Sequence, residues 1–235
     1  MTDIHCHLIY GVDDGCIKIE ESVDILRDLY NYGYRNVIVT PHYIKDSNYS
    51  SPARENFKRM KELQKVLDQN GIGIKLYLGN EIYMDDDIYE LLSKGLIYSL
   101  NGTEYLLIEL PMDGEYPNYE EIFRDLMSKG CKIILAHPER YLAFQKNFEI
   151  IYELEKMGVF FQGNLDSIIG RYGEGAKVMI KRLLKEKKIA FLATDIHHKK
   201  HDYASWDKAR DEILKYISKS EFDILVNENP SKLVS

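Results

Sequence analysis

The sequence predicts an α/β fold in which parallel strands alternate with helices along the chain. Short β-branched or apolar runs recur, and stretches with helical periodicity separate them. This alternation is typical of βαβ units that build a parallel sheet. The length of 235 residues suits one α/β barrel, and no stretch rich in Pro, Gly or Ser divides the chain. We therefore expect a single domain over residues 1–235.

Seven strands and seven helices follow from this pattern. Glycine stands just past several helical stretches, as at Gly33, Gly71 and Gly130, where helices commonly end. The chain after Ser218 is expected to fray at its last few residues. The predicted strands are Asp3–His7, Asn36–Thr40, Ile74–Gly79, Tyr105–Leu110, Lys132–Ala136, Val159–Gln162 and Ile189–Thr194. The predicted helices are Ile19–Tyr32, Pro52–Asn70, Asp86–Lys94, Asn118–Lys129, Phe148–Lys156, Gly175–Lys187 and Tyr203–Ser218.

Composition and charge exclude several classes of protein. The hydrophobic share of 45% and the charged share of 29% are typical of a globular chain, which excludes disorder, collagen and coiled coils. The net charge of −7 repels a phosphate backbone and disfavours a nucleic-acid partner. The start Met1-Thr2-Asp3 lacks the basic residues and apolar run of a signal peptide, and no later run has membrane-spanning length. We expect a cytoplasmic protein with no direct membrane insertion.

The cysteines favour neither disulfides nor thiolate chemistry. Cys6, Cys16 and Cys131 are odd in number and have no Cys-x-x-Cys spacing, so the sequence indicates no disulfide framework or zinc–thiolate site. None has arginine six positions later, so the thiolate-plus-arginine loop of cysteine-dependent phosphatases is absent.

Histidines and acids gather where the predicted strands end. His5 and His7 alternate on the first strand, so both imidazoles share a face and suit one metal ion. Glu109 lies within an apolar run that disfavours an unpaired carboxylate, and a metal would compensate it. The carboxyl ends of parallel barrel strands meet on one face, where barrel enzymes keep their active sites. The other candidates at strand ends are His42, Glu81, His137, Asp195 and His197.

Each candidate also has a plainer interpretation. His42 or His137 alone would more often be a hydrogen-bonded histidine near the core, Glu81 a helix N-terminal acid and Asp195 a cap. Asp13-Asp14-Gly15 reads most simply as a turn, and only one of its two acids is assigned a function. His198 and His201, beside two lysines, are expected to be solvated. The joint pattern nevertheless favours a metal site.

These residues resemble the PHP (polymerase and histidinol phosphatase) superfamily. The motifs that carry the likeness are His5-x-His7, Asp14, Thr40-Pro41-His42, Glu81, Glu109, His137-Pro138-Glu139-Arg140 and Asp195-x-His197. The sequence is most similar to the branch of bacterial metal-dependent protein-tyrosine phosphatases from capsule and exopolysaccharide loci, and the likeness covers nearly the whole chain. It implies a distorted seven-stranded (β/α)7 barrel, a strand number that the periodicity reaches independently.

The resemblance implies three divalent metal ions, usually manganese. The mixed imidazole and carboxylate set also suits Fe²⁺ or Zn²⁺. The first ion would be held by His5, His7, Glu81 and Asp195, the second by Glu81, Glu109 and His137, and the third by Asp14, His42 and His197, with Glu81 bridging. Arg140 matches the arginine implicated in phosphoryl binding and catalysis. Relatives commonly carry a further arginine after the Asp-x-His motif, where this chain has Lys199 and Lys200 as candidate replacements.

The implied function is a manganese-dependent protein-tyrosine phosphatase. Its substrate would be a phosphotyrosyl protein, expected to be a bacterial tyrosine kinase that controls capsule synthesis, and metal-activated hydroxide would attack phosphorus directly. The phenolate leaving group has a pKa near ~10, so no general acid is named. Two alternatives stay open: a phosphatase for a small metabolite such as histidinol phosphate, and a metal-stabilised regulatory domain without catalysis. The sequence does not predict the oligomeric state.

Overall fold

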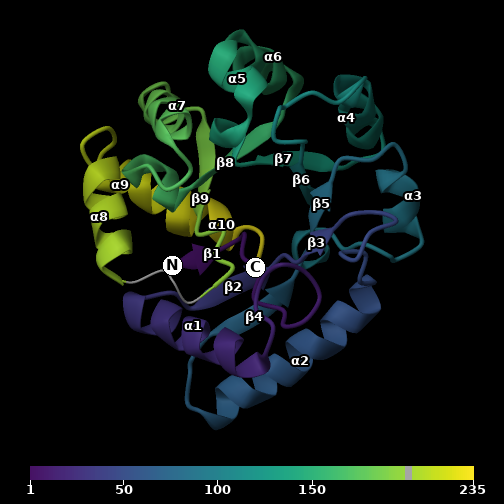
Figure 1. The fold of residues 1–235 in the computed structure, drawn as a ribbon, viewed down its shortest axis with the longest axis vertical. Coiled ribbons are helices and arrows are strands. Elements are labelled where there is room, and N and C mark those ends of the chain that lie inside the picture. The colour runs from purple at the N-terminus through teal and green to yellow at the C-terminus, as the bar shows by residue number, and fades with distance from the viewer. Residues whose placement is uncertain (199–202) are drawn as a thin grey trace.

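Short parallel strands surrounded by helices form a ring in the computed structural model, which describes residues 1–198 and 203–235 (Figure 1). The strands are β1 Thr2–Asp3, β2 Asn36–Val39, β3 His42–Tyr43, β4 Lys75–Leu78, β5 Glu81–Tyr83, β6 Tyr105–Glu109, β7 Lys132–Ala136, β8 Phe160–Asn164 and β9 Ile189–Ala193. The α-helices are α1 Ile19–Tyr32, α2 Ala53–Gln69, α3 Ile88–Ser93, α4 Tyr119–Ser128, α5 Leu142–Lys146, α6 Glu149–Met157, α7 Glu174–Lys185, α8 Tyr203–Ile213, α9 Lys219–Asp223 and α10 Asn229–Ser231. Shorter helical turns are η1 Leu100–Gly102, η2 Pro138–Arg140, η3 Leu165–Ile169 and η4 Ile224–Glu228.

The strands form two sheets, and every pairing is parallel. The first sheet has the order β1-β2-β4 and the second the order β3-β5-β6-β7-β8-β9. The chain passes from the first sheet to the second twice, between β2 and β3 and between β4 and β5. On the other side of the ring, an isolated parallel bridge joins Cys6 to Ile196. The expected parallel α/β fold is therefore confirmed.

The strand number and the closure differ from the prediction. In the described part of the chain the structure has nine strands rather than seven, and its ladders do not close into one barrel. Two predicted strands stop early and a separate short strand follows each of them. Pro41 has no N–H for a ladder, and the N–H of Asn80 donates to the carbonyl of Tyr98 at 3.0 Å instead of to a neighbouring strand. A Cβ atom on Gly79 would come within 2.7 Å of Leu100. The predicted first strand, Asp3–His7, also shortens to Thr2–Asp3.

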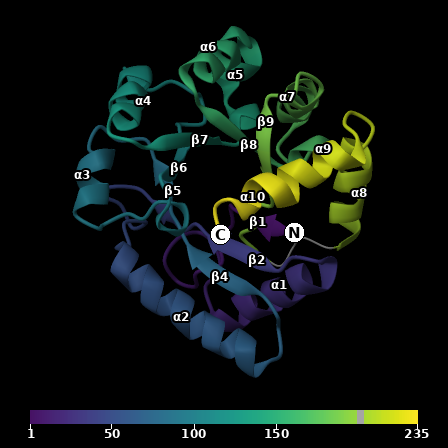
Figure 2. The ribbon, with the colours of Figure 1, turned by 180° about the vertical axis from the view of Figure 1, so that it is seen from behind.

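The inner face of the ring is apolar, and the C-terminal segment closes one end of it. Figure 2 shows α9 to α10 lying across that end. Leu233 is fully buried there, and its carbonyl accepts a hydrogen bond from Asn101 Nδ2 at 3.0 Å. The expected fraying of the last residues is not found, because this burial and hydrogen bond hold them. The inner cluster comprises Ile4, Ile38, Leu100, Leu107, Ile134, Ala136, Phe191, Ala193 and Leu233.

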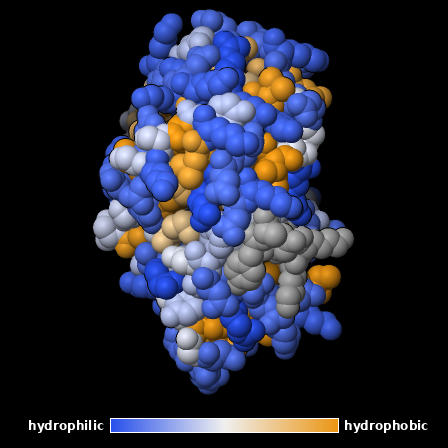
Figure 3. All heavy atoms as spheres, turned by 90° about the vertical axis from the view of Figure 1, so that its left-hand side faces the viewer, coloured by the Kyte–Doolittle hydropathy of each residue, from blue (hydrophilic) through white to orange (hydrophobic). Residues whose placement is uncertain are grey.

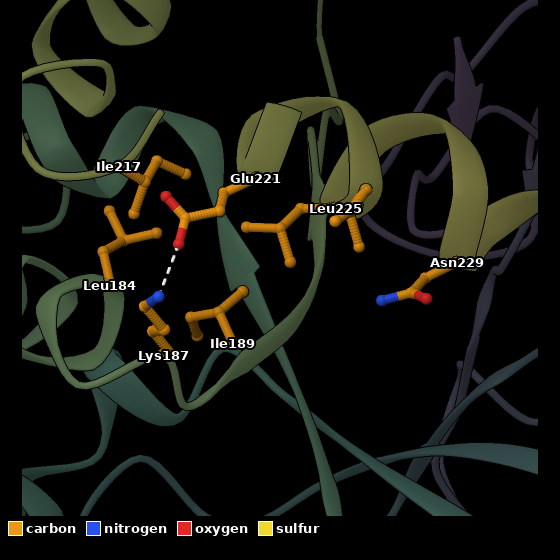
Figure 4. Close-up of a pocket in the computed structure, with 8 residues that line it drawn as sticks. Leu184, Lys187, Ile189, Ile217, Glu221, Leu225 and Asn229 are labelled. Atoms are coloured by element: carbon orange, nitrogen blue, oxygen red, sulfur yellow. Dashed lines mark ion pairs between the residues drawn. The ribbon is translucent and has the colours of Figure 1, made fainter. Parts of the chain in front are cut away.

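A small apolar pocket lies beside this C-terminal segment (Figure 4). Its volume is about 170 Å³, and Leu184, Ile189 and Leu225 contribute to its lining. Lys187 Nζ and Glu221 Oε1 pair across it at 2.7 Å. Ile189 begins β9, so this pocket lies at the opposite end of the strands from the candidate site described below.

The outer surface is mainly hydrophilic on the face that Figure 3 shows, with apolar side chains in small separate groups. In the part of the chain that the structure describes, we find no helix with the length and apolar character needed to cross a membrane.

Candidate metal centre

All nine predicted metal ligands gather at one end of the ring, where His42 and Glu81 begin the short strands β3 and β5 and Glu109 ends β6. A cleft of about 400 Å³ opens there. Parallel pairing brings these positions together, since the partner of His42 on β3 is Glu81 on β5. The nine residues fall into four overlapping groups whose possible ligand atoms lie within 4.8 Å of one another. The groups are His5, His7 and Glu81; His5, His137 and Asp195; His42, Glu81 and Glu109; and His7, Asp14, His42 and His197.

The most buried group surrounds one oxygen of Glu81. Glu81 Oε2 lies 3.2 Å from the Nε2 atoms of both His5 and His7. Asp195 Oδ1 lies 3.4 Å from the same two nitrogens, which are 3.3 Å apart. Ligands at about 2.1 Å from one ion are separated by about 3 Å or slightly more. This spacing fits the first ion implied by the sequence.

The other oxygen of Glu81 reaches a second group. Glu81 Oε1 lies 2.9 Å from His137 Nε2, and Glu109 Oε1 lies 3.5 Å from that nitrogen. On the far side, His42 Nδ1 lies 3.0 Å from Glu81 Oε2 and 3.8 Å from Glu109 Oε2. Glu81 therefore stands between the two groups, as a bridging carboxylate would.

The third group lies nearer the solvent. Asp14 Oδ1 is 3.6 Å from His42 Nε2 and 3.5 Å from His197 Nε2. The side chain of Asp14 is 47% exposed, whereas His7 beside it is fully buried. His7 also joins this group, which the sequence assignment did not include.

The donor set fits divalent cations. Glu81 Oε2 is buried and accepts no hydrogen bond from the described residues, although three imidazole nitrogens lie within 3.2 Å of it. A divalent cation bound among these imidazole and carboxylate groups would satisfy their lone pairs. His5, His7, Glu81 and Asp195 have suitable atoms for one ion, and the two outer groups for others.

The electrostatics of the carboxylates and imidazoles are strongly perturbed. Burial acts to raise the pKa of Glu81, but His5 and His42 hold it well below its usual range. Burial and the neighbouring charge of Glu81 raise the pKa of Glu109 to about 8. Burial acts to lower the pKa of His5, yet the charges of Glu81 and Asp195 raise it to about 9. Such shifts are typical of functional sites.

Two candidate ligands have left-handed backbones. His137 has φ 32° and Asp195 has φ 50°, a conformation that costs free energy for residues other than glycine. Each follows the end of a strand and turns the chain so that its side chain enters the cleft. His137 is followed by Pro138 at the start of η2, a helical turn that ends at Arg140.

Arg140 lies at the edge of this cluster. Its Nη1 donates a hydrogen bond to Asp195 Oδ2 at 3.1 Å, and its guanidinium lies 4.5 Å from the centre of the Tyr172 ring. The side chain keeps 24% of its surface exposed and lines the cleft. It therefore presents a fixed positive charge beside the candidate metal ligands.

Several neighbouring residues were not singled out from the sequence. Asp13 accepts hydrogen bonds from His7 Nδ1 and from the backbone N–H of His42. Gln162 bonds His5, and Asn164 bonds Asp195. Period-2 alternation on one strand would have placed Gln162 and Asn164 on a shared face, but amides carry no metal-ligand signal.

His198 directly follows the Asp195-x-His197 motif. His198 is exposed and lines the cleft. Lys199, Lys200 and His201 lie outside the described residues. Among the described residues that line the cleft, a second arginine, Arg171, accompanies Arg140. The Nη1 atom of Arg171 pairs with Asp166 Oδ2 at 3.1 Å.

Comparisons with known proteins identify the family of this chain. A family model for capsular polysaccharide synthesis, CpsB/CapC, matches residues 1–235. The chain is 34% identical over 201 residues to the tyrosine-protein phosphatase YwqE of Bacillus subtilis (strain 168), which covers 85% of this chain and 78% of that protein. It is 31% identical over 242 residues to the tyrosine-protein phosphatase CpsB of Streptococcus pneumoniae, covering 100% and 98%.

Solved structures with the same fold also match this chain. A structure from work on YwqE of Bacillus subtilis and CpsB of Streptococcus pneumoniae, described as unique metal-dependent tyrosine phosphatases, matches with a TM-score of 0.91 and 30% identity, covering 100% of this chain and 94% of the other. Histidinol phosphate phosphatase from Lactococcus lactis matches with a TM-score of 0.60 and 17% identity, covering 92% and 93%. The second likeness shows a shared fold alone.

Proposed function

The chain belongs to the CpsB/CapC family of capsular polysaccharide synthesis, and we propose that it is a metal-dependent phosphatase that removes phosphate from tyrosine in proteins. The resemblance to the capsule-locus phosphatases of the PHP superfamily is confirmed by this match and by the identity of 34% with YwqE, a tyrosine-protein phosphatase. The observation that carries the proposal is the position of Arg140 beside the nine clustered ligands, at the edge of one cleft.

We propose that the ligand set binds three divalent ions, Mn²⁺ with Fe²⁺ or Zn²⁺ as substitutes. When bound, such ions supply hydroxide at neutral pH and neutralise phosphoryl oxygens. Arg140 would bind the equatorial phosphoryl oxygens while Asp195 Oδ2 and the Tyr172 ring hold its guanidinium. No cysteine is among the described residues that line the cleft, so the proposed reaction uses no cysteine nucleophile.

The cleft geometry suits an aryl phosphate. Tyr49, Met112 and Tyr172 contribute to its lining, so a phenyl ring can contact apolar surface while its phosphate reaches Arg140 and the cluster. We propose a phosphotyrosyl protein as the substrate, specifically a bacterial tyrosine kinase of capsule synthesis, and a cytoplasmic location. We further propose that residues 1–235 act as one domain.

The test is turnover of phosphotyrosyl peptide by metal-loaded protein, with metal content measured on the same sample. We expect turnover that depends on Mn²⁺ and a kcat/KM on phosphotyrosyl peptide well above that on histidinol phosphate. A higher kcat/KM on histidinol phosphate would overturn the proposed substrate. Bound metal without turnover of any aryl phosphate would favour a regulatory domain instead.

A further inference from the structure

Two buried amides on β8 contact the cluster from inside the ring. Gln162 and Asn164 are both fully buried and, being two residues apart on a strand, lie on the same face. Gly163 faces the other way, since a Cβ atom there would lie 2.6 Å from Ile180 on α7. Buried amides in a largely apolar interior call for hydrogen-bond partners.

The hydrogen bonds of these amides run in one direction. His5 Nε2 faces the carboxylates of Glu81 and Asp195 at 3.2 and 3.4 Å, so Nε2 is the nitrogen that would ligate an ion. A ligating imidazole then carries its proton on Nδ1. His5 Nδ1 therefore donates to Gln162 Oε1 at 2.7 Å.

The direction at His5 determines the orientation of both amides. Gln162 accepts through Oε1, so its Nε2 donates to Asn164 Oδ1 at 2.8 Å. Asn164 in turn donates from Nδ2 to Asp195 Oδ2 at 2.6 Å. With either amide turned over, two acceptors or two donors would face each other. The bonded chain runs from His5 through Gln162 and Asn164 to Asp195.

Asp195 divides its two oxygens between this chain and the candidate metal site. Its Oδ1 lies 3.4 Å from the Nε2 atoms of His5 and His7. Its Oδ2 accepts from Asn164 and from Arg140 Nη1, the latter at 3.1 Å. The backbone N–H of Asn164 also donates to Glu139 Oε1 at 2.9 Å, which ties β8 to the turn that carries Arg140.

We propose that Gln162 and Asn164 are positioning residues that link the metal ligand His5 to the phosphate-binding Arg140 through one hydrogen-bonded chain. Gln162 keeps His5 Nε2 free for an ion, and Asn164 holds Asp195 so that Oδ2 stays directed at Arg140. The role of Arg140 in this inference rests on the proposed phosphatase function, whereas the role of His5 rests on metal binding alone.

The metal arm is tested by titrating purified protein with Mn²⁺ in competition with a chelator. Gln162→Leu should weaken Mn²⁺ binding by about 10- to 100-fold, the usual loss for a partner that orients a ligand. Gln162→Glu keeps an acceptor for His5 Nδ1 but loses the donor to Asn164 Oδ1, so its Mn²⁺ affinity should fall by less than that of Gln162→Leu. Equal losses in both variants would overturn the proposed role of Gln162.

Asn56→Ala is the matched control for losing a buried amide. Asn56 is fully buried on α2, and its side chain bonds Ser51 only among the described residues. It should lower the melting temperature without changing Mn²⁺ affinity or kcat/KM. A loss of Mn²⁺ affinity equal to that of Gln162→Leu would assign the effect to general destabilisation and overturn the inference.

The arginine arm is tested by a double-mutant cycle on phosphotyrosyl peptide at saturating Mn²⁺. Asn164→Ala should reduce kcat/KM by about 10- to 100-fold in the native background and by less than about threefold in an Arg140→Ala background, because both changes remove one coupled interaction. Equal reductions in the two backgrounds would overturn the link to Arg140. If the native protein binds Mn²⁺ but hydrolyses no aryl phosphate, the proposed function fails, and the Mn²⁺ affinities alone decide the role of Gln162.

Discussion

The carboxylate of Asp13 accepts a hydrogen bond from His7 Nδ1 at 2.8 Å. The same oxygen, Oδ2, accepts the backbone N–H of His42 at 3.0 Å, and Oδ1 accepts the N–H of Gly15 at 3.0 Å. One buried acid therefore orients two of the proposed ligands and shapes the turn that carries Asp14. Both acids of the Asp13-Asp14-Gly15 turn contribute to the site, one by orienting ligands and the other as a candidate ligand.

Asp13→Ala should reduce Mn²⁺ affinity by about 10- to 100-fold, because His7 loses the acceptor that fixes its ring. Asp13→Asn retains an acceptor oxygen and should lose less. Competition with a chelator measures the Mn²⁺ affinity of both variants. Native affinity in Asp13→Ala would show that the hydrogen bond has no part in metal binding.

His5→Ala and His137→Ala should each lose metal and activity together. The groups share ligands, since His5 belongs to two of them and His137 contacts both Glu81 and Glu109. Loss of one ligand should therefore weaken the binding of more than one ion. Elemental analysis and turnover on the same samples check this, and full activity of either variant at limiting metal would contradict the shared cluster.

Arg140→Ala should leave metal content unchanged, because arginine does not ligate cations. It should reduce kcat/KM by ~10²- to 10³-fold, with a clear effect on kcat, as expected for a donor that strengthens its interaction in the transition state. Arg140→Lys should recover only part, for want of a bidentate fork. Near-normal kcat/KM in Arg140→Ala would show that Arg140 serves only as the ion-pair partner of Asp195 and does not bind the phosphate.

Metal loading should release protons and become tighter as the pH rises from 7 to 9. The pKa of His5 is raised to about 9 and that of Glu109 to about 8, so the metal-free site holds protons at pH 7 that an ion must displace. His7 and His42 also have a raised pKa, so they add to the protons that an ion must displace. Calorimetry in buffers of different ionisation enthalpy measures the release. An affinity independent of pH across this range would contradict the protonated metal-free state.

Thiol reagents should leave turnover largely intact. Burial raises the pKa of the Cys6 thiol well above its usual value and that of Cys16 to about 11, so neither supplies a thiolate at neutral pH. Cys131 is only partly buried and should react first. Mass spectrometry identifies the modified residue. Loss of turnover with unchanged metal content would point to a cysteine nucleophile.

Much of the candidate site was accessible from the sequence because parallel strands end on a common side. Placing His42, Glu81 and His137 directly after apolar runs was enough to bring them to one end of the fold. The spacing of His5 and His7 likewise put both imidazoles on one face. Their role as ligands stays a prediction, although all nine candidates meet in four overlapping groups.

The tertiary structure decided what local periodicity does not encode. Whether Pro41 and Gly79 lie within strands or between two sheets depends on which distant segments approach them. Leu233 is buried at the end of the chain because the ring leaves space for it. His5 and Gln162 are 157 residues apart, yet their hydrogen bond sets the direction of the chain to Asp195. The alternation of residues along a strand predicts the face on which a side chain lies. Its hydrogen-bond partner, and which of the two groups donates, are determined only when separate strands pack together.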